Sequence, residues 1–281
     1  LVRSRGLGDV YKRQTFDEIR DRKFDGLIVT GAPVEDITFE EVDYWEETCQ
    51  ILDWAETHVT STLHICWAAQ AGFYHYYGIN KRQLSQKLFG VYAHKVSNRK
   101  VPLVRGFDDI FMAPHSRHTE TPSEAIHACK DLTILAESEK AGVFLAMAEE
   151  GKKIFVAGHP EYDRYTLNNE YHRDLDKGLP IQIPYNYYPD DDPEQRPLLQ
   201  WRSHCNNLYS NWLNYYVYQT GIDQSVNNTL SMHTYQWFRG VKGNGHQPAA
   251  ESGCNKDGAL CTVRLQCGDS GTCDLSLCHI L

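Results

Sequence analysis

A strand-like run that passes directly into a helix-like run at a single cysteine constrains this chain more than any other feature of its sequence. Residues 60–65 (TSTLHI) are β-branched and apolar, as is typical of a buried strand, and residues 67–77 (WAAQAGFYHYY) have the pattern of a helix. Cys66 stands between them. Residues 24–29 and 39–56 repeat the alternation as another strand and an amphipathic helix. This alternation predicts an α/β fold with a mostly parallel sheet, which binds ligands at the carboxyl ends of its strands.

The rest of the middle region continues this pattern with shorter elements. We predict successive strands at 132–138, 143–149 and 153–157 with a turn at 150–151, a turn-rich stretch at 113–122, a polar helix at 165–178 and part of a last helix at 212–218. No internal repeat interrupts this order. Residues 15–220 are therefore predicted to form one domain.

Composition limits the classes of partner. The 281 residues carry 28 Lys and Arg against 37 Asp and Glu, a formal charge of −9, and they contain no basic block. A net acidic chain of this kind is a poor binder of nucleic acids. No apolar run approaches the roughly 20 residues that span a bilayer. We therefore expect a cytoplasmic protein with a small-molecule partner, and with neither nucleic acid nor membrane as a partner.

The two ends differ in composition from the middle. Residues 1–14 are basic and turn-rich, and residues 221–281 are rich in Gly, Asn, Ser and Cys without a clear period. The cysteines of the last segment lack the C-x2-C pairs of a zinc site. We predict that both ends are foreign to the domain at 15–220, that 221–281 is disordered, and that the protein holds no metal.

The position of Cys66 is typical of a nucleophile elbow, in which a sharp strand-to-helix turn projects a side chain above the sheet. The start of the helix favours the thiolate, and its backbone N–H groups can receive an oxyanion. A buried core cysteine is the alternative. His159 and Glu161 follow another predicted strand, in FVAGHPEYD. Because a thiolate nucleophile needs an imidazole, and the imidazole an orienting acid, these three residues together favour a catalytic site.

Longer motifs resemble one known family. They are LIVTGAP (27–33), DYWEE (43–47), VTSTLHICWAAQAG (59–72), KLFGVY (87–92), RGFDDIFMAPHSRHTE (105–120), AGHPEYD (157–163), PYNYYPDDDP (184–193) and NWLNYYVYQ (211–219). In uninterrupted order over residues 15–220, they are similar to the homoserine O-acyltransferases of methionine biosynthesis.

The resemblance implies a flavodoxin-like three-layer α/β sandwich like that of class I glutamine amidotransferases, here lacking the N-terminal strand or strands of the family. It also implies ping-pong acyl transfer without a metal or other cofactor, with acetyl-CoA as co-substrate and L-homoserine as acceptor. Cys66 matches the nucleophile that carries the acyl group as a thioester, and His159 matches the general base. Glu161 matches the acid that completes the site, by orienting His159 or by steadying the substrate ammonium.

Four further positions carry over from the resemblance. Arg173 matches the residue that pairs with the homoserine carboxylate, and Lys87 matches another substrate-binding position. Ser116 matches a residue of the acceptor pocket. Ser116 and Glu35 also match positions that are associated with the choice of acyl donor, Ser116 being the former and Glu35 the latter. In the family, Glu at the latter position goes with acetyl-CoA and Gly with succinyl-CoA, because a carboxylate repels the free carboxylate of succinyl. The resemblance therefore implies that the product is O-acetyl-L-homoserine.

Three alternatives stay open at this point. The first is succinyl transfer by the same site. The second is a hydrolase related to class I amidotransferases, although the elbow HICWAAQ lacks the glycines of their G-x-C-x-G sequence. The third is an inactive fragment, or a fusion whose Cys-rich tail forms a binding module. A homodimer is also compatible with the sequence.

Overall fold

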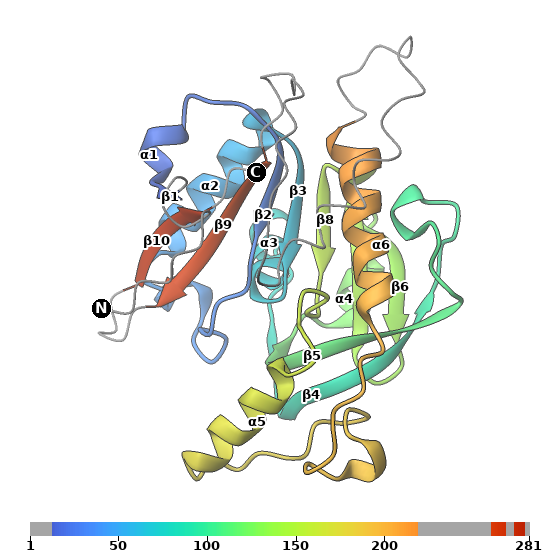
Figure 1. Ribbon diagram of the computed structural model, residues 1–281. Helices are drawn as coiled ribbons and strands as arrows, with labels where there is room; N and C mark the ends of the chain where they lie inside the picture. The colour runs from blue at the N-terminus through green and yellow to red at the C-terminus, as the bar shows by residue number, and fades with distance from the viewer. Residues whose placement is uncertain (1–12, 219–259, 268–272, 279–281) are drawn as a thin grey trace, which may run out of the picture.

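One ten-stranded sheet runs through the computed structural model, which describes residues 13–218, 260–267 and 273–278 (Figure 1). Its strands lie side by side in the order β1 (Arg13–Gln14), β10 (Cys273–Cys278), β9 (Leu260–Cys267), β2 (Phe24–Val29), β3 (Val59–Ile65), β8 (Lys153–Val156), β7 (Gly142–Ala148), β6 (Thr133–Ser138), β4 (Arg82–Val96) and β5 (Ile110–Glu120). The α-helices are α1 (Phe16–Ile19), α2 (Trp45–His58), α3 (Trp67–Tyr77), α4 (Ser123–Ala128), α5 (Thr166–Asp176) and α6 (Arg202–Trp212).

The sheet is mixed. Strands β9, β2, β3 and β8 are parallel to one another, whereas the remaining neighbouring pairs are antiparallel. The prediction of a mostly parallel sheet is therefore wrong. The reason lies in the short connections between β6, β7 and β8, because parallel neighbours need a crossover of a dozen or more residues.

Helices cover both faces of the sheet. On one face, Phe73 of α3 stacks on Phe155 of β8, with ring centroids 4.4 Å apart. On the other face, Trp212 of α6 packs in one buried cluster with Leu63 of β3, and a π-helix, Leu213–Val217, continues this layer (Figure 1). The expected three-layer α/β arrangement is thus confirmed.

The long β4–β5 hairpin is the largest departure from the predicted elements. Residues 113–122 were expected to be turn-rich, but most of them belong to β5, so that prediction is wrong. β5 lies at the edge of the sheet, where Pro114 is tolerated because no further strand needs its missing N–H. Along β5 the buried Arg117 and Thr119 alternate with the half-buried Ser116 and His118, as the two-residue repeat of a strand requires.

Two strands lie within the segment for which we expected disorder. β9 pairs in parallel with β2, from Gly26 opposite Leu260 to Val29 opposite Val263, and β10 pairs with β9. At these positions the chain is extended and hydrogen-bonded. The rest of that segment lies outside the described residues, and so do residues 1–12.

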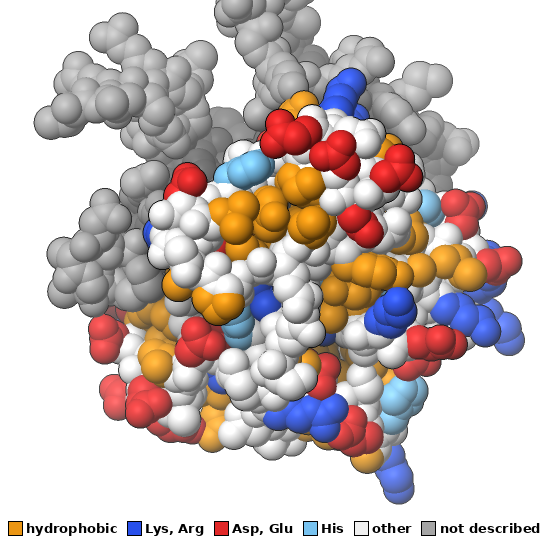
Figure 2. Space-filling view, turned by 90° about the horizontal axis from the view of Figure 1, so that it is seen from below, with side chains coloured by type: hydrophobic (Ala, Val, Ile, Leu, Met, Phe, Trp, Pro, Cys, Tyr) orange, Lys and Arg blue, Asp and Glu red, His pale blue; other side chains and the backbone are white. Residues whose placement is uncertain are grey.

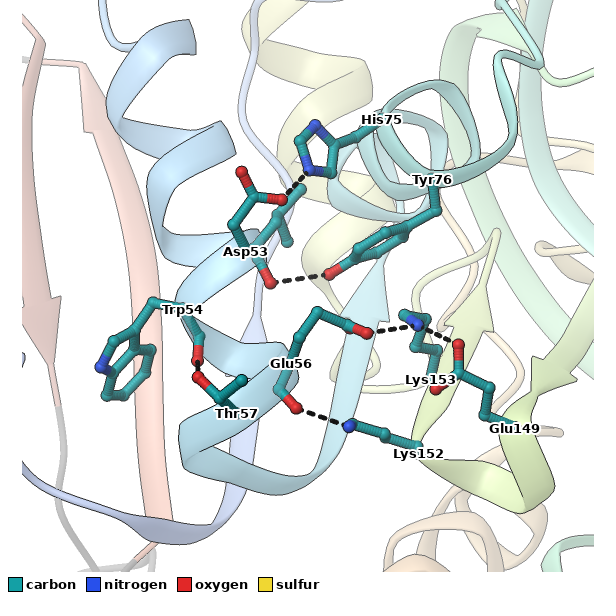
Figure 3. A network of polar contacts seen from close by, with 10 residues as sticks. Asp53, Trp54, Glu56, Thr57, His75, Tyr76, Glu149, Lys152 and Lys153 are labelled. Carbon is teal, nitrogen blue, oxygen red and sulfur yellow. Dashed lines mark hydrogen bonds and ion pairs between the residues drawn. The ribbon is translucent and has the colours of Figure 1, made fainter.

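A network of charged groups joins α2, α3 and β8 at the amino end of β8 (Figure 3). The ammonium of the buried Lys153 contacts Glu56 at 2.8 Å and also Glu149, and it lies 4.7 Å from the ring centroid of Tyr76. Burial by itself would lower the pKa of Lys153, but the hydrogen bonds to Glu149 and Glu56 raise it above its ordinary value. Lys153 therefore stays charged inside the protein and holds three elements together.

Seen from below, the described surface carries acidic and basic side chains intermingled with hydrophobic ones (Figure 2). Exposed hydrophobic residues in or beside α5 include Tyr165, Leu175 and Leu179. No helix in the described part of the chain combines the length and the apolar character needed to cross a membrane.

Candidate active site

Cys66 occupies a strained turn between β3 and α3. Its backbone has φ 55° and ψ −117°, a region that residues other than glycine rarely adopt. Its N–H donates to the carbonyl of Val156 in β8, at 2.8 Å, and the residue is 8% exposed. A Cβ atom at Gly31 would lie 3.1 Å from the Cβ of Cys66. The turn expected from the sequence is present; β8 holds its backbone, and Gly31 leaves free the space beside Cys66 that a larger residue would occupy.

His159 and Glu161 meet Cys66 at this end of the sheet. The Nδ1 atom of His159 lies 2.8 Å from Oε1 of Glu161, and the Cys66 thiol lies within electrostatic range of the imidazole. Burial opposes protonation of His159, but Cys66 and Glu161 outweigh it and raise the pKa of the imidazole well above its ordinary value. Because Nδ1 faces Glu161, Nε2 is the nitrogen left for Cys66. This geometry suits a thiolate paired with an imidazolium.

A second group of polar side chains lies beside the imidazole. The ring of Tyr162 stacks on His159, and its hydroxyl donates to Oε1 of Glu170 at 2.9 Å. The hydroxyl of Ser116 donates to Oε2 of the same carboxylate at 2.6 Å. Burial raises the pKa of Tyr162, so this phenol stays protonated and remains a donor. Tyr162 thus connects the histidine with a carboxylate on α5.

Lys87 and Arg173 complete this second group. The ammonium of Lys87 lies 3.7 Å from Oε2 of Glu170 and 3.5 Å from Oδ2 of Asp174. The guanidinium of Arg173 donates to Oδ1 of Asp174 and, together with Lys87, lowers the pKa of that carboxyl. The Arg173 side chain is 53% exposed. It can therefore still receive a carboxylate from solution.

Glu35 is held against the backbone of β5. Its Oε2 atom accepts hydrogen bonds from the N–H of His118 at 2.7 Å, the N–H of Thr119 at 3.1 Å and the Thr119 hydroxyl at 3.2 Å. The ammonium of Lys81 donates to the backbone carbonyl of Glu35 at 2.6 Å. Both the side-chain carboxylate and the backbone carbonyl of Glu35 are therefore held by hydrogen bonds.

A buried guanidinium supports the loop that carries His159. Arg117 is 3% exposed, and it donates through Nη1 to the carbonyl of Ala157 at 2.8 Å and through Nη2 to that of Ala141 at 2.6 Å. The N–H of His159 itself donates to the carbonyl of Pro114 at 2.9 Å. The imidazole is thus positioned from β5 on its backbone side. Among the described residues, no group of three or more His, Cys, Asp or Glu side chains could hold a metal ion.

The residues singled out in the sequence fall into three places. Cys66, His159 and Glu161 lie together, with the His159 imidazole bonded to Glu161 and close to Cys66. Ser116, Lys87 and Arg173 surround the carboxylates of Glu170 and Asp174, and Glu35 lies farther along β5 from Ser116.

Sequence reasoning missed Tyr162, Glu170 and Asp174. The spacing within α5 could have revealed two of them, because Glu170 and Asp174 are four residues apart and share a face of the helix with each other. A pair of acids on one face, close to a basic residue that the motif already singled out, indicates a polar pocket rather than a solvated surface.

A family model described as homoserine O-succinyltransferase matches residues 4–222. The chain belongs to this family. Homoserine O-succinyltransferase family members are acyltransferases, so the expected enzyme class is confirmed.

Relatives within the family are similar over most of the chain. A homoserine O-acetyltransferase from Agathobacter rectalis is 67% identical over 215 residues, which are 76% of this chain and 69% of that protein. One from Lachnoclostridium phytofermentans is 65% identical over 205 residues, covering 73% and 68% of the two chains. One from Petrotoga mobilis is 58% identical over 226 residues, covering 78% and 72%. The family description thus names succinyl transfer, whereas these relatives are named for acetyl transfer.

A solved structure of a glutamine amidotransferase from Methylobacillus flagellatus is also similar to this family member. Its TM-score is 0.48 at 9% identity, and the match covers 68% of this chain and 94% of that one.

Proposed function

We propose that this chain transfers the acetyl group of acetyl-CoA to the γ-hydroxyl of L-homoserine through a thioester on Cys66. The observation that carries the proposal is the hydrogen-bonded pair of His159 and Glu161 beside the strained turn at Cys66, at the end of β3. The high identity to relatives named homoserine O-acetyltransferase supports the choice of substrates.

In the first half-reaction, the Cys66 thiolate attacks the thioester carbonyl of acetyl-CoA. The new bond joins Sγ to the acetyl carbon, and the bond to the CoA sulfur breaks. The protonated His159 gives its proton to the departing CoA thiolate, so that CoA leaves as the thiol. The first backbone N–H groups of α3 would stabilise the oxyanion of the tetrahedral intermediate.

In the second half-reaction, the neutral His159 removes the proton of the homoserine hydroxyl while its oxygen attacks the acetyl group on Cys66. The ester bond forms, the bond from the acetyl carbon to Sγ breaks, and the thiolate and the imidazolium are regenerated. Glu161 on Nδ1 keeps the imidazole oriented and stabilises its positive charge. This contact favours the orienting role for Glu161 over contact with the substrate ammonium.

The group around α5 is the proposed acceptor pocket. Arg173 would pair with the homoserine carboxylate, since its guanidinium is half exposed and planar. Glu170 and Asp174 would attract the substrate ammonium, while Lys87 balances their charge. Ser116 would line the pocket beside them, with its hydroxyl on Glu170.

The fixed carboxylate of Glu35 supports acetyl as the acyl group. A charge that is held in one place repels the free carboxylate of a succinyl group at short range, whereas an acetyl group has no charge to repel. The second candidate is succinyl transfer by the same residues, which the family description favours. No metal or other cofactor enters either scheme.

The test is CoA release by the purified chain with L-homoserine, measured side by side with acetyl-CoA and succinyl-CoA. We expect activity with acetyl-CoA, an added acetyl group on Cys66 by intact mass when homoserine is omitted, and loss of both in Cys66→Ser. Activity with succinyl-CoA alone would favour the second candidate. Release of CoA without formation of an acyl-homoserine would indicate a hydrolase, and no CoA release with either donor would overturn the proposal.

A further inference from the structure

The carboxylate of Glu35 does not act alone, because a threonine and a glutamine from two other elements hold it. Thr119 of β5 contributes both its N–H and its hydroxyl to Oε2 of Glu35. The side chain of Gln70 in α3 contacts Thr119 twice: Nε2 donates to the Thr119 carbonyl at 3.1 Å, and Oε1 lies 3.1 Å from the hydroxyl. Thr119 and Gln70 are 2% and 4% exposed.

The hydroxyl of Thr119 has one proton for two acceptors. Because Nε2 of Gln70 needs the carbonyl of Thr119, the amide is fixed with its oxygen toward the hydroxyl. An ionised carboxylate is a stronger acceptor than an amide oxygen, so the proton goes to Glu35. Gln70 then holds Thr119 through the bond from Nε2 to the Thr119 carbonyl, and this fixes the backbone from which the N–H and the hydroxyl reach Glu35.

Gln70 also belongs to the first turn of the helix that begins at the proposed nucleophile. Its backbone N–H donates to the carbonyl of Cys66 at 3.2 Å. The same residue therefore contacts the turn that carries the thiol and the strand that holds Glu35. This arrangement fixes the position of the Glu35 carboxylate relative to Cys66.

We propose that Thr119 and Gln70 are positioning residues that set acyl-donor selectivity by holding the Glu35 carboxylate in place. This inference rests on the function proposed above for Glu35. Neither residue needs to touch the acyl group. Their effect is on the distance between two like charges, and the energy of that interaction falls as the distance grows.

The surroundings of Glu35 explain why holding it matters. Two cations, Lys81 and Arg117, lie within electrostatic range of this carboxylate. A carboxylate that could turn toward either cation would be neutralised in part and would repel a succinyl group less. The hydrogen bonds on β5 prevent that rotation. Loss of the Thr119 hydroxyl should therefore weaken discrimination without removing any charge.

The test compares the ratio of kcat/KM for acetyl-CoA to kcat/KM for succinyl-CoA in matched variants. Thr119→Val has nearly the same shape but no hydroxyl, and we expect the ratio to fall about fivefold to tenfold, as for the loss of one ordinary hydrogen bond, because the two backbone N–H groups still hold the carboxylate. Thr119→Ser keeps the hydroxyl and should restore the ratio. Thr48→Val removes a buried hydroxyl of α2 that donates to the carbonyl of Tyr44, and it should leave the ratio unchanged.

A second variant keeps the proposal testable if Thr119→Val does not fold. Gln70→Met leaves the hydroxyl in place but removes the amide that holds the Thr119 carbonyl, and the ratio should fall in the same direction. Glu35→Gly distinguishes the holding role of Thr119 and Gln70 from the role of Glu35 itself. If it changes the ratio while Thr119→Val and Gln70→Met do not, the holding role is overturned and the proposed function stands. If Glu35→Gly leaves the ratio unchanged, the role of Glu35 is wrong and this inference falls with it.

Discussion

The ring of Tyr162 lies against the imidazole of His159, with centroids 4.2 Å apart and planes 16° from parallel. The hydroxyl at the far end of the same ring donates to Glu170. One side chain thus joins the proposed base to the proposed acceptor pocket. Separate substitutions can remove the hydroxyl alone or the whole stacked ring.

Tyr162→Phe keeps the ring and removes the hydroxyl. We expect kcat to change little and the KM for homoserine to rise about tenfold, because Glu170 loses a hydrogen bond that fixes it. Tyr162→Leu also removes the stacked ring and should lower kcat as well. Steady-state kinetics at saturating acetyl-CoA distinguishes these effects, and an unchanged KM in Tyr162→Phe would contradict the link.

His159 should make stability depend on pH. Its pKa in the folded protein is raised well above the unfolded value of about 6.5, so protonation favours the folded state. This contribution is fully present below about pH 6.5 and is lost as the pH rises through the folded pKa. We expect the melting temperature of the wild type, relative to His159→Gln, to be highest at low pH and to decline as the pH increases. A difference that grows with pH would refute the ion pair.

Glu35→Gln separates charge from shape in donor choice. The amide oxygen of Gln can still accept from the N–H groups of His118 and Thr119, so the side chain should stay in place. If repulsion is the main effect, kcat/KM for succinyl-CoA rises about tenfold and that for acetyl-CoA stays the same. If instead only Glu35→Gly admits succinyl-CoA, the side chain acts by its bulk.

Gly31→Ala should displace the nucleophile. The added Cβ would lie 3.1 Å from the Cβ of Cys66 and 3.6 Å from its Sγ, so one of the two backbones must shift. We expect acyl transfer to fall at least about tenfold, because small misplacements of a reacting group are costly. The rate of Cys66 alkylation by iodoacetamide, followed by peptide mass, should fall in parallel. Unchanged transfer and alkylation rates would show that the turn accommodates the added methyl group.

The network at Lys153 predicts unequal effects of removing its partners. Lys153→Met leaves Glu56 and Glu149, whose side chains are 33% and 52% exposed and can turn to water. Glu56→Gln combined with Glu149→Gln leaves a buried ammonium without its two ion pairs, which costs about 3–5 kcal/mol of unfolding free energy. Urea unfolding should therefore show the larger loss for the double variant. Equal losses would mean that packing of the Lys153 stem dominates.

Local signals explain why the nucleophile turn was predictable. The helix begins at Trp67 and ends at Tyr77 as expected, and Gly78 takes the left-handed conformation with φ 66° that closes it. The preceding strand, Val59–Ile65, is one residue longer than predicted. Because the apolar pattern, the turn and the end of the helix all lie within about twenty residues, these features can be predicted from the sequence alone.

β5 was missed because its stabilising contacts are distant in sequence. APHSRHTE contains a proline and four ionisable side chains, a composition typical of a turn. In the structure Arg117 can be buried because the carbonyls of Ala141 and Ala157 accept hydrogen bonds from its guanidinium. Those acceptors come from other segments, and no local pattern reveals them. The partners of Glu170, Ser116 and Lys87, likewise lie far from it in sequence, although its spacing from Asp174 within α5 is a local signal.

β8 is four residues long, which corresponds to roughly 13 Å of extended chain. Lys153 begins this strand, and His159 follows shortly after its end. Hydrogen bonds on both sides leave so short a segment almost no room to stretch or bend. A shift of its outer end along the strand axis would therefore displace the imidazole by a similar amount. Substitutions around Glu56 and Glu149, which are remote from any substrate, can in this way alter turnover while substrate affinity stays the same.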